Sequence, residues 1–358
     1  MEALLLVSSI AVFYSIYLIL ALSFNLEYGF AGQPNLGKVF FYSLGAYTAG
    51  WFTATVIMHA SGGGDYCSGE AIATMLAFGS EHPGMTAGLF VASLILALII
   101  GAVAGYLSSY PALRLTEDFL AITLLAIGEI GRIIARTSRF VCGVTGLTGL
   151  PNPFQWLGNP TLVNIAYAIL ALAIAGLTYL IVELLSNSPF GRVLKSVRDD
   201  ELAAEVMGKD VARVKGVVLM IGSALAAMAG VIYAFYAQSV IPDDFIPNVT
   251  FVVIAMTMLG GAANNRGVLV GTLIITLLDQ LLNSSTLDRL GVPVNTLPIN
   301  INYVKYMTIG LIIVLVLMFR PQGLIPEEPL KTPAVEMAAR AQSTLSQSQS
   351  GPEEEPEE

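Results

Sequence analysis

Long apolar runs separated by short polar stretches make up most of the chain. The first run is "LLLVSSIAVFYSIYLILALSF" at 4–24, and a later one is "IGLIIVLVLMF" at 309–319. About 20 apolar residues in a helix cross a bilayer, so runs of this kind predict transmembrane helices. The segments with this pattern are 4–24, 38–58, 87–108, 119–135, 161–185, 214–238, 248–262, 267–284 and 303–319. We therefore predict an all-α polytopic membrane protein with about nine transmembrane or re-entrant helices, the short segment 248–262 being re-entrant or tilted.

Composition supports the same class. The chain has 358 residues, of which 55% are hydrophobic and 12% are charged. A soluble domain has about 25% charged residues, so this chain has too few charges to cover a soluble surface. The first apolar run is expected to be a retained span, because Glu2 stands where a signal peptide has basic residues and the run is too long for its apolar core.

The negative net charge is concentrated in one segment. Of the formal charge of -9, the residues from Glu327 onward contribute eight acidic and two basic side chains. This segment is rich in Glu, Ser, Gln and Pro and has too little apolar surface to fold alone. We divide the chain into a membrane domain, 1–325, and a disordered acidic tail, 326–358. Without a basic surface, no nucleic-acid partner is expected.

Basic residues predict the orientation, because they favour cytoplasmic loops. Segments 59–86 and 239–247 contain no Lys or Arg, whereas 185–215 contains Arg192, Lys195, Arg198, Lys209, Arg213 and Lys215. Placing 185–215 in the cytoplasm puts the N-terminus outside and the C-terminus, with its tail, inside. Arg136 and Arg139 then lie on the outer side, against the rule.

The two cysteines, Cys67 and Cys142, fall on the outer side in this topology. They either form a disulfide or remain two unpaired small hydrophobic residues. Their spacing does not fit a metal site, and none is expected.

The stretch "SVRDDELAAEVMGKDVARVKG" at 196–216 is dense in charge and interrupts the apolar pattern. Asp199 or Asp200 can cap a short helix over 199–208, and Gly208 can end it in a left-handed conformation. Leu202 and Val206, with Ala203 and Met207, form one small apolar face. This face favours docking into a groove on another protein. The alternative is a helix lying on lipid headgroups. Asp210 can cap the helix that follows.

Several motifs then carry a family resemblance. The segment "ELAAEVMG" (201–208) matches the E-x-A-A-x-x-x-G form of the cytoplasmic coupling loop of ABC importer permeases, although "GVVLMIG" stands where I-x-L-P usually follows. Residues 5 to 325 resemble LivM-type permeases of branched-chain amino acid importers. The other matching stretches are "EYGFAGQPNLGKVFFYSLGAYTAG", "LRLTEDFLAITLLAIGEIGRI", "GVTGLTGLP", "LGGAANNRGVLVGTLI" and "FRPQGL".

The resemblance implies a permease subunit that imports branched-chain amino acids across the cytoplasmic membrane. It implies no chemistry by the chain itself and no cofactor. The implied partners are a second, LivH-type permease, two cytoplasmic ABC ATPases and an extracytoplasmic substrate-binding protein. The residues implied in ATPase coupling are Asp199, Asp200, Glu201, Leu202, Ala203, Ala204, Glu205, Met207 and Gly208, with Glu201 expected to meet a basic residue of the ATPase. Alternatives are a urea or short-chain amide importer, or an ion-coupled secondary transporter.

Two further groups are candidates for the transport pathway. The segment "GQPNLGKV" (32–39) has P-loop spacing, but Val39 stands where magnesium needs Ser or Thr. Its glycines and proline would interrupt a helix, so it is either part of a pathway or an ordinary turn. The candidates here are Gly32, Gln33, Pro34 and Asn35. Glu129 and Arg132, three apart on one helix, would pair within the membrane and either line the pathway or fix helix packing.

Small residues and one acid complete the expectations. Gly267 and Gly271, and Gly45 and Ala49, have the spacing that lets helices pack closely. Asp279 is expected to face an external vestibule or water. The sequence has no H-E-x-x-H or G-x-S-x-G pattern, so an enzyme is not expected.

Overall fold

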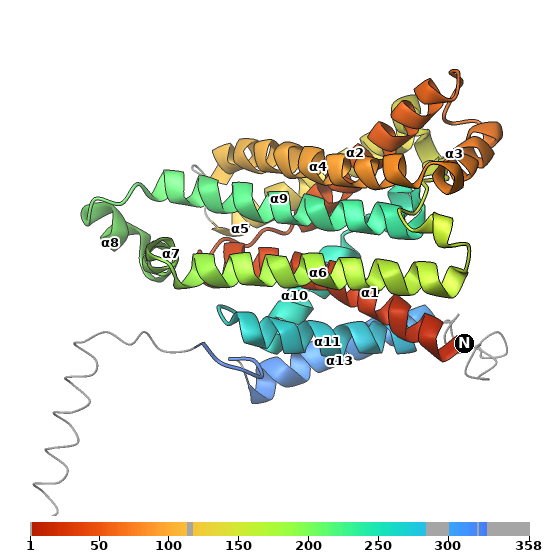
Figure 1. The fold of residues 1–358 in the computed structure, drawn as a ribbon. Helices are drawn as coiled ribbons and strands as arrows, with labels where there is room; N and C mark the ends of the chain where they lie inside the picture. Colours follow the sequence, from red (N-terminus) through yellow and green to blue (C-terminus); the bar gives the residue numbers. More distant parts are fainter. Residues whose placement is uncertain (1, 113–116, 284–300, 321, 328–358) are drawn as a thin grey trace, which may run out of the picture. The chain divides into compact units, whose positions relative to one another are not determined.

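The computed structural model describes residues 2–112, 117–283, 301–320 and 322–327. The chain divides into two units, Met1–Pro326 and Glu327–Glu358. The predicted disordered tail lies outside the described residues, apart from its first positions. Figure 1 shows the first unit as a bundle of long helices.

Each of the nine apolar segments forms a helix. These helices are α1 (Glu2–Phe24), α2 (Lys38–Ala60), α4 (Pro83–Ala112), α5 (Glu117–Thr137), α6 (Pro160–Asn187), α9 (Val211–Ala237), α10 (Asn248–Gly260), α11 (Asn265–Leu281) and α13 (Ile301–Phe319). Within the described residues, five stretches are long and apolar enough to cross a membrane: Leu4–Phe30, Pro83–Tyr110, Pro160–Asn187, Val211–Ala237 and Pro242–Gly260. The helical, polytopic class is thus confirmed, while the count of nine spans stays a prediction.

Helix α9 is the centre of the bundle and packs against α2 and α4. Close approach depends on small residues: a Cβ added at Gly45 of α2 would overlap the Ala227 backbone of α9, and one at Gly230 of α9 would overlap Tyr42. In the second predicted pair, Gly267 and Gly271 of α11, Gly267 faces the backbone of Gly260 in α10. The predicted packing role of these small residues is confirmed.

The outward faces of α4 and α6 are apolar. Ile95 is 54% exposed and Ile169 is 63% exposed, although both side chains are large and hydrophobic. A protein in water rarely leaves such faces open, whereas a bilayer covers them without cost.

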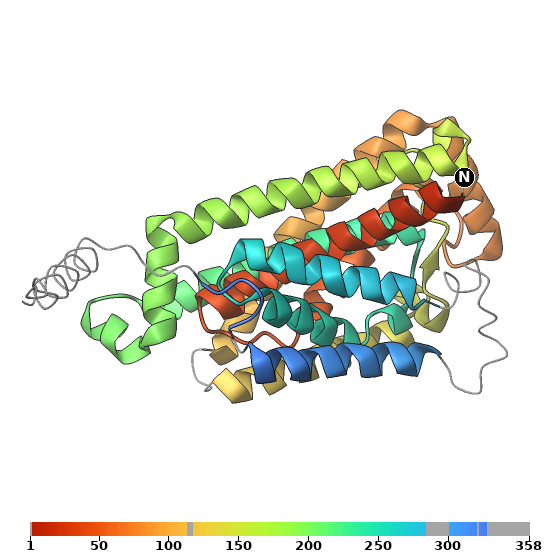
Figure 2. The ribbon, with the colours of Figure 1, turned by 90° about the horizontal axis from the view of Figure 1, so that it is seen from below.

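The sequence pattern missed two short helices, α3 (Gly69–Glu81) and α7 (Pro189–Asp199), and did not separate α7 from α8 (Glu201–Val206). Local signals start the two missed helices. Ser68 caps α3 by accepting a hydrogen bond from the Ala71 N–H, and Ser188 caps α7, which begins at Pro189. Helix α3 lies at the same end of the bundle as the N-terminus, and α7 and α8 lie at the opposite end (Figures 1 and 2).

Connections at the α3 end are held by two cross-links. The short strands β1 (Leu147–Thr148) and β2 (Ser239–Val240) pair antiparallel. Cys67 and Cys142 form a disulfide with Cα atoms 5.4 Å apart, which decides between the two alternatives left by the sequence. It ties the segment before α3 to the turn that follows α5.

Candidate functional site

The charged stretch folds as α7, a sharp corner and α8. Asp200 is the cap of α8, since its carboxylate accepts a hydrogen bond from the Ala203 N–H at 3.0 Å. Asp199 instead ends α7 and pairs with Arg198. The predicted helix over 199–208 is therefore too long: α8 ends at Val206, and α7 occupies the residues up to Asp199.

The predicted end of the coupling helix at Gly208 and the predicted cap of the next helix at Asp210 are both confirmed. Gly208 has φ +77°, and the neighbouring Lys209 N–H donates to the Ala204 carbonyl at 3.0 Å. This left-handed termination satisfies the last carbonyls of the helix. Asp210 accepts from the Arg213 N–H at 3.0 Å and so caps α9. Helix α8 is closed at both ends by its own sequence.

One side of α8 is buried and the other is open. Ala204 is buried against Val197 of α7 and Val211 of α9. On the open side, Leu202 is 75% exposed, Val206 is 89% exposed and Met207 is 81% exposed. Ala203 and Glu205 are exposed as well. We call Leu202, Val206 and Met207 the apolar tip. Three such side chains gathered beyond the bundle are typical of a protein-docking surface.

Glu201 has a partner within the chain, and its predicted contact with a basic residue of the ATPase stays a prediction. Its carboxylate forms an ion pair with the Lys215 ammonium near the start of α9. Glu201 is 42% exposed at its side chain and Lys215 is 10% exposed. The pair braces α8 against the bundle, so Glu201 serves the orientation of α8 within the chain.

Helix α7 also contacts the segment 25–37, where α-helical geometry stops between the first two long helices; we call this segment the interruption. Helix α1 continues as a π-helix, η1 (Asn25–Phe30), and residues 31–37 are not helical before α2 begins. The Arg198 guanidinium donates a hydrogen bond to the Gly29 carbonyl at 2.7 Å. The Lys195 ammonium lies 5.5 Å from the centre of the Phe30 ring. The charged helices are therefore attached directly to the interruption.

The interruption holds the predicted pathway residues in a buried setting. Gly32 has φ +73°, and a Cβ there would lie 3.1 Å from Arg198 Cγ. Gln33 is 1% exposed and Asn35 is fully buried. Among the described residues, the Gln33 side-chain amide has no hydrogen-bond partner. An unsatisfied buried amide is unusual in a folded protein. Pro34 lies between these two amide side chains.

The sequence pattern did not predict a buried ion pair at the interruption. The Glu27 carboxylate and the Lys38 ammonium lie 2.7 Å apart and are buried. Gly222 of α9 makes room for Glu27, because a Cβ there would overlap its carboxylate. Two ionisable residues on either side of a helix-breaking segment were the available signal, since such residues in a membrane are usually paired.

Amide side chains link the interruption to other helices. Asn25 accepts a hydrogen bond from the Ala263 N–H at 2.8 Å and donates to Asn265 at 2.9 Å. Asn265 donates in turn to Glu183 of α6 at 2.7 Å. The start of α11 and the end of α6 are thereby fastened to η1.

The predicted Glu129–Arg132 pair forms on α5, with Arg132 Nη2 at 2.5 Å from Glu129 Oε1. Arg132 also reaches Asp243 of η5 (Pro242–Asp244) at 3.3 Å. This pair connects α5 to η5, whereas residues 32–35 lie beside α7. The structure therefore does not bring the two groups of candidates together in one site.

Known proteins similar to this chain are transport permeases. The family model described as "Branched-chain amino acid transport system / permease component" matches residues 6–317. A relative from Methanocaldococcus jannaschii, named probable branched-chain amino acid transport permease protein LivM, is 34% identical over 92% of this chain and 95% of its own length. The high-affinity branched-chain amino acid transport system permease proteins LivM of Salmonella typhimurium and Escherichia coli are each 26% identical over 88% of this chain and 69% of their own.

No solved structure matches the chain. The family consists of transport permeases, so the chain is a membrane transport subunit and not an enzyme. The match spans the helices, the interruption at 25–37 and the α7–α8 segment, and by this match the chain belongs to the family of permease components of branched-chain amino acid transport systems.

Proposed function

We propose that the chain is a permease subunit of an ABC importer for branched-chain amino acids and that α8 is the helix on which an ATPase subunit docks. The names of its relatives support the substrate class. The apolar tip carries the docking proposal, because Val206 is 89% exposed on a helix that is capped by Asp200 and joined to α9 by the Glu201–Lys215 pair.

In this proposal the α7–α8 end faces the cytoplasm of a cell whose inner membrane holds the bundle. The six basic residues of 185–215 support that orientation. The N-terminus, α3 and the disulfide then face outward, where oxidising conditions preserve a disulfide. The membrane domain ends near residue 325, and the acidic tail is cytoplasmic and is not needed for transport.

The proposed complex has two permeases, this chain and a LivH-type relative, with two ATPases and an external binding protein. Binding of ATP closes the ATPases and displaces α8. The Arg198 guanidinium of α7 donates a hydrogen bond to the Gly29 carbonyl at 2.7 Å. This contact transmits the displacement from α7 to the interruption. Gly32, Gln33, Pro34 and Asn35 then act as part of the gate, which explains a buried amide without a partner.

Substituting the apolar tip tests this function. Val206→Asp is expected to abolish co-purification of the ATPase and leucine uptake, because the charge would be buried in the docking groove. Val144→Asp is the matched control, since Val144 is 55% exposed near the opposite end of the bundle. It should retain the ATPase.

Uptake measurements on the same complex test the substrate class and the energy source. Uptake of leucine, isoleucine and valine, but not of urea, is expected, and it should stop when ATP is depleted. Retention of the ATPase by Val206→Asp would exclude α8 as the docking helix. Uptake that survives ATP depletion with an ion gradient would exclude the importer class.

A further inference from the structure

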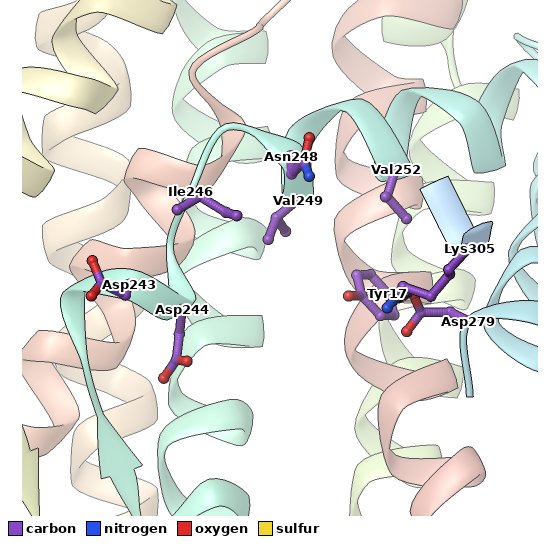
Figure 3. Close-up of a pocket in the computed structure, with 9 residues that line it drawn as sticks. All are labelled: Tyr17, Asp243, Asp244, Ile246, Asn248, Val249, Val252, Asp279 and Lys305. Atoms are coloured by element: carbon purple, nitrogen blue, oxygen red, sulfur yellow. Dashed lines mark ion pairs between the residues drawn. The ribbon is translucent and has the colours of Figure 1, made fainter. Parts of the chain in front are cut away.

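A cavity of about 210 Å³ lies between α1, the η5–α10 segment, α11 and α13 (Figure 3). It is smaller than the about 300–1,000 Å³ that drug-sized ligands occupy, and so it suits a small molecule. Its lining combines charged, polar and branched apolar side chains: Tyr17, Asp243, Asp244, Ile246, Asn248, Val249, Val252, Asp279 and Lys305.

One wall of the cavity carries a cation held beside an anion. Lys305 of α13 and Asp279 of α11 form an ion pair at 2.8 Å, and each side chain is 12% exposed. Figure 3 shows this pair next to Tyr17 of α1. Asp279 therefore lines a cavity in the bundle, while its position in an external vestibule stays a prediction. An ammonium group has three N–H donors, so it can bind a carboxylate in addition to Asp279.

The opposite wall carries acids. Asp243 is engaged by Arg132 at 3.3 Å and by Arg136 at 3.5 Å. Asp244 is half-buried and hydrogen-bonded to Tyr233. Both acids come from η5 and lie across the cavity from Asp279 and Lys305 (Figure 3). With Asp243 already matched by two arginines, Asp244 is the acid on this wall best placed to receive an ammonium group.

Branched apolar side chains lie between the two polar walls. Ile246, Val249 and Val252 come from one continuous segment that runs from η5 into α10. They offer a surface for an aliphatic group while the charged groups remain on either side. An apolar α-amino acid carries an ammonium group, a carboxylate and an aliphatic side chain. The cavity has a partner for each of them: an acid, a cation and an aliphatic surface.

We propose that this cavity is a binding site for a zwitterionic amino acid with a branched aliphatic side chain. Its ammonium group lies toward Asp244, its carboxylate shares Lys305 with Asp279, and its side chain contacts Val249 and Val252. The inference rests on the proposed function and assigns to this chain a substrate contact of its own, separate from the external binding protein. Urea has no carboxylate to pair with Lys305 and no aliphatic group to contact Val249 and Val252.

Cysteine labelling tests the site directly. The chain's two cysteines are joined in a disulfide, so Val249→Cys introduces the single free thiol of this chain. The permease–ATPase complex is reconstituted in proteoliposomes without the binding protein, so that protection cannot come from the latter. Leucine is expected to slow labelling of the Val249→Cys protein by a small methanethiosulfonate reagent. Ser80→Cys, on the exposed end of α3, is the control that leucine should not affect.

Two leucine analogues separate the polar contacts. Leucinamide lacks the carboxylate, and 4-methylpentanoate lacks the ammonium group, yet both keep the side chain. Each is expected to protect at least about tenfold less well than leucine, the factor that corresponds to about 1.4 kcal/mol. Equal protection by either analogue would overturn the assignment of its missing group.

Variants of the lining complete the test. Asp244→Asn should weaken protection by leucine about tenfold or more, in line with the loss of one charged hydrogen bond. Lys305→Met alone leaves Asp279 unpaired and can unfold the protein, so it is combined with Asp279→Asn. The double variant should keep normal Ser80→Cys labelling and lose protection. Full protection in either variant would overturn the proposal.

The outcome is distinguishable from a failure of the proposed function. Leucine uptake is measured in the wild-type complex with its binding protein and ATP. Normal leucine uptake by the wild-type complex, without protection of Val249→Cys by leucine, would overturn the proposed binding site and leave the proposed function intact. Protection by leucine without uptake would support the cavity and exclude the importer.

Discussion

The Glu27 carboxylate and the Lys38 ammonium lie 2.7 Å apart, with Glu27 fully buried and Lys38 only 1% exposed. Glu27 belongs to the π-helix η1, and Lys38 is the first residue of α2. The pair therefore closes the interruption between two long helices, and it does so where water cannot compensate either charge. Glu27 lies in the same short segment as Gly29 and Phe30, which contact α7.

Breaking this pair from one side should destabilise the protein strongly. In Lys38→Met, the Glu27 carboxylate stays buried without a counter-charge, which typically costs about 3–5 kcal/mol. We expect a clear fall in the thermal unfolding temperature of the detergent-solubilised complex. Glu27→Gln/Lys38→Met, in which both charges are removed, should recover most of the loss. A double variant less stable than Lys38→Met would show that the two residues act independently.

Gly208 tests whether the termination of α8 matters for coupling. With φ +77° and no neighbouring atom within 4 Å of an added Cβ, substitution costs backbone strain alone. That strain is roughly 1–2 kcal/mol for a residue with a side chain, and it is higher for a β-branched one. Gly208→Val should reduce leucine uptake per ATP hydrolysed while expression stays normal. Gly208→Asn should remain near wild type, because Asn tolerates the left-handed region. Equal, fully coupled uptake in both variants would contradict a coupling role for α8.

The Glu201–Lys215 pair should orient α8 without adding much stability. Glu201 is 42% exposed at its side chain, and pairs with one such exposed partner contribute about 0–1 kcal/mol. Glu201→Lys places two cations together and should lower uptake with little change in unfolding temperature. The exchanged variant Glu201→Lys/Lys215→Glu should restore uptake. If the exchange fails while the ATPase still binds, Glu201 acts by a contact outside the chain.

The disulfide should hold the α3 end without affecting ATPase docking. Cys67 and Cys142 close a loop with a sequence separation of 75, and a cross-link of this kind contributes about 2–4 kcal/mol. Cys67→Ser/Cys142→Ser should increase protease cleavage within 59–86. ATPase co-purification should not change, because α8 lies at the opposite end of the bundle (Figure 1). Loss of the ATPase in this variant would show that the two ends are not independent.

Local features could be predicted from the sequence. The apolar runs specify where the long helices lie, because helix length and bilayer thickness are matched. The cap at Asp210 and the stop at Gly208 follow from side-chain and backbone chemistry within a few residues. The Glu129–Arg132 pair also follows, because residues three apart meet on one helix face.

Amphipathic elements were harder to predict. Helices α3 and α7 are short and mixed in polarity, so a search for apolar runs does not find them. The coupling helix predicted over 199–208 was too long, because α7 runs to Asp199 and the chain changes direction at Asp200. Hydropathy does not indicate this change of direction.

Contacts between distant segments were decided by the tertiary structure alone. Glu27 meets Lys38 across an interruption, Glu201 meets Lys215 across a corner, and Asp279 meets Lys305 between helices. Each of these charges was visible in the sequence, but its partner was not. An apolar run specifies a helix through its length, whereas the rotation and depth of that helix depend on close packing of small residues against its neighbours, such as Gly45 of α2 against Ala227 of α9. Only that packing determines which charges face each other and which surround a cavity.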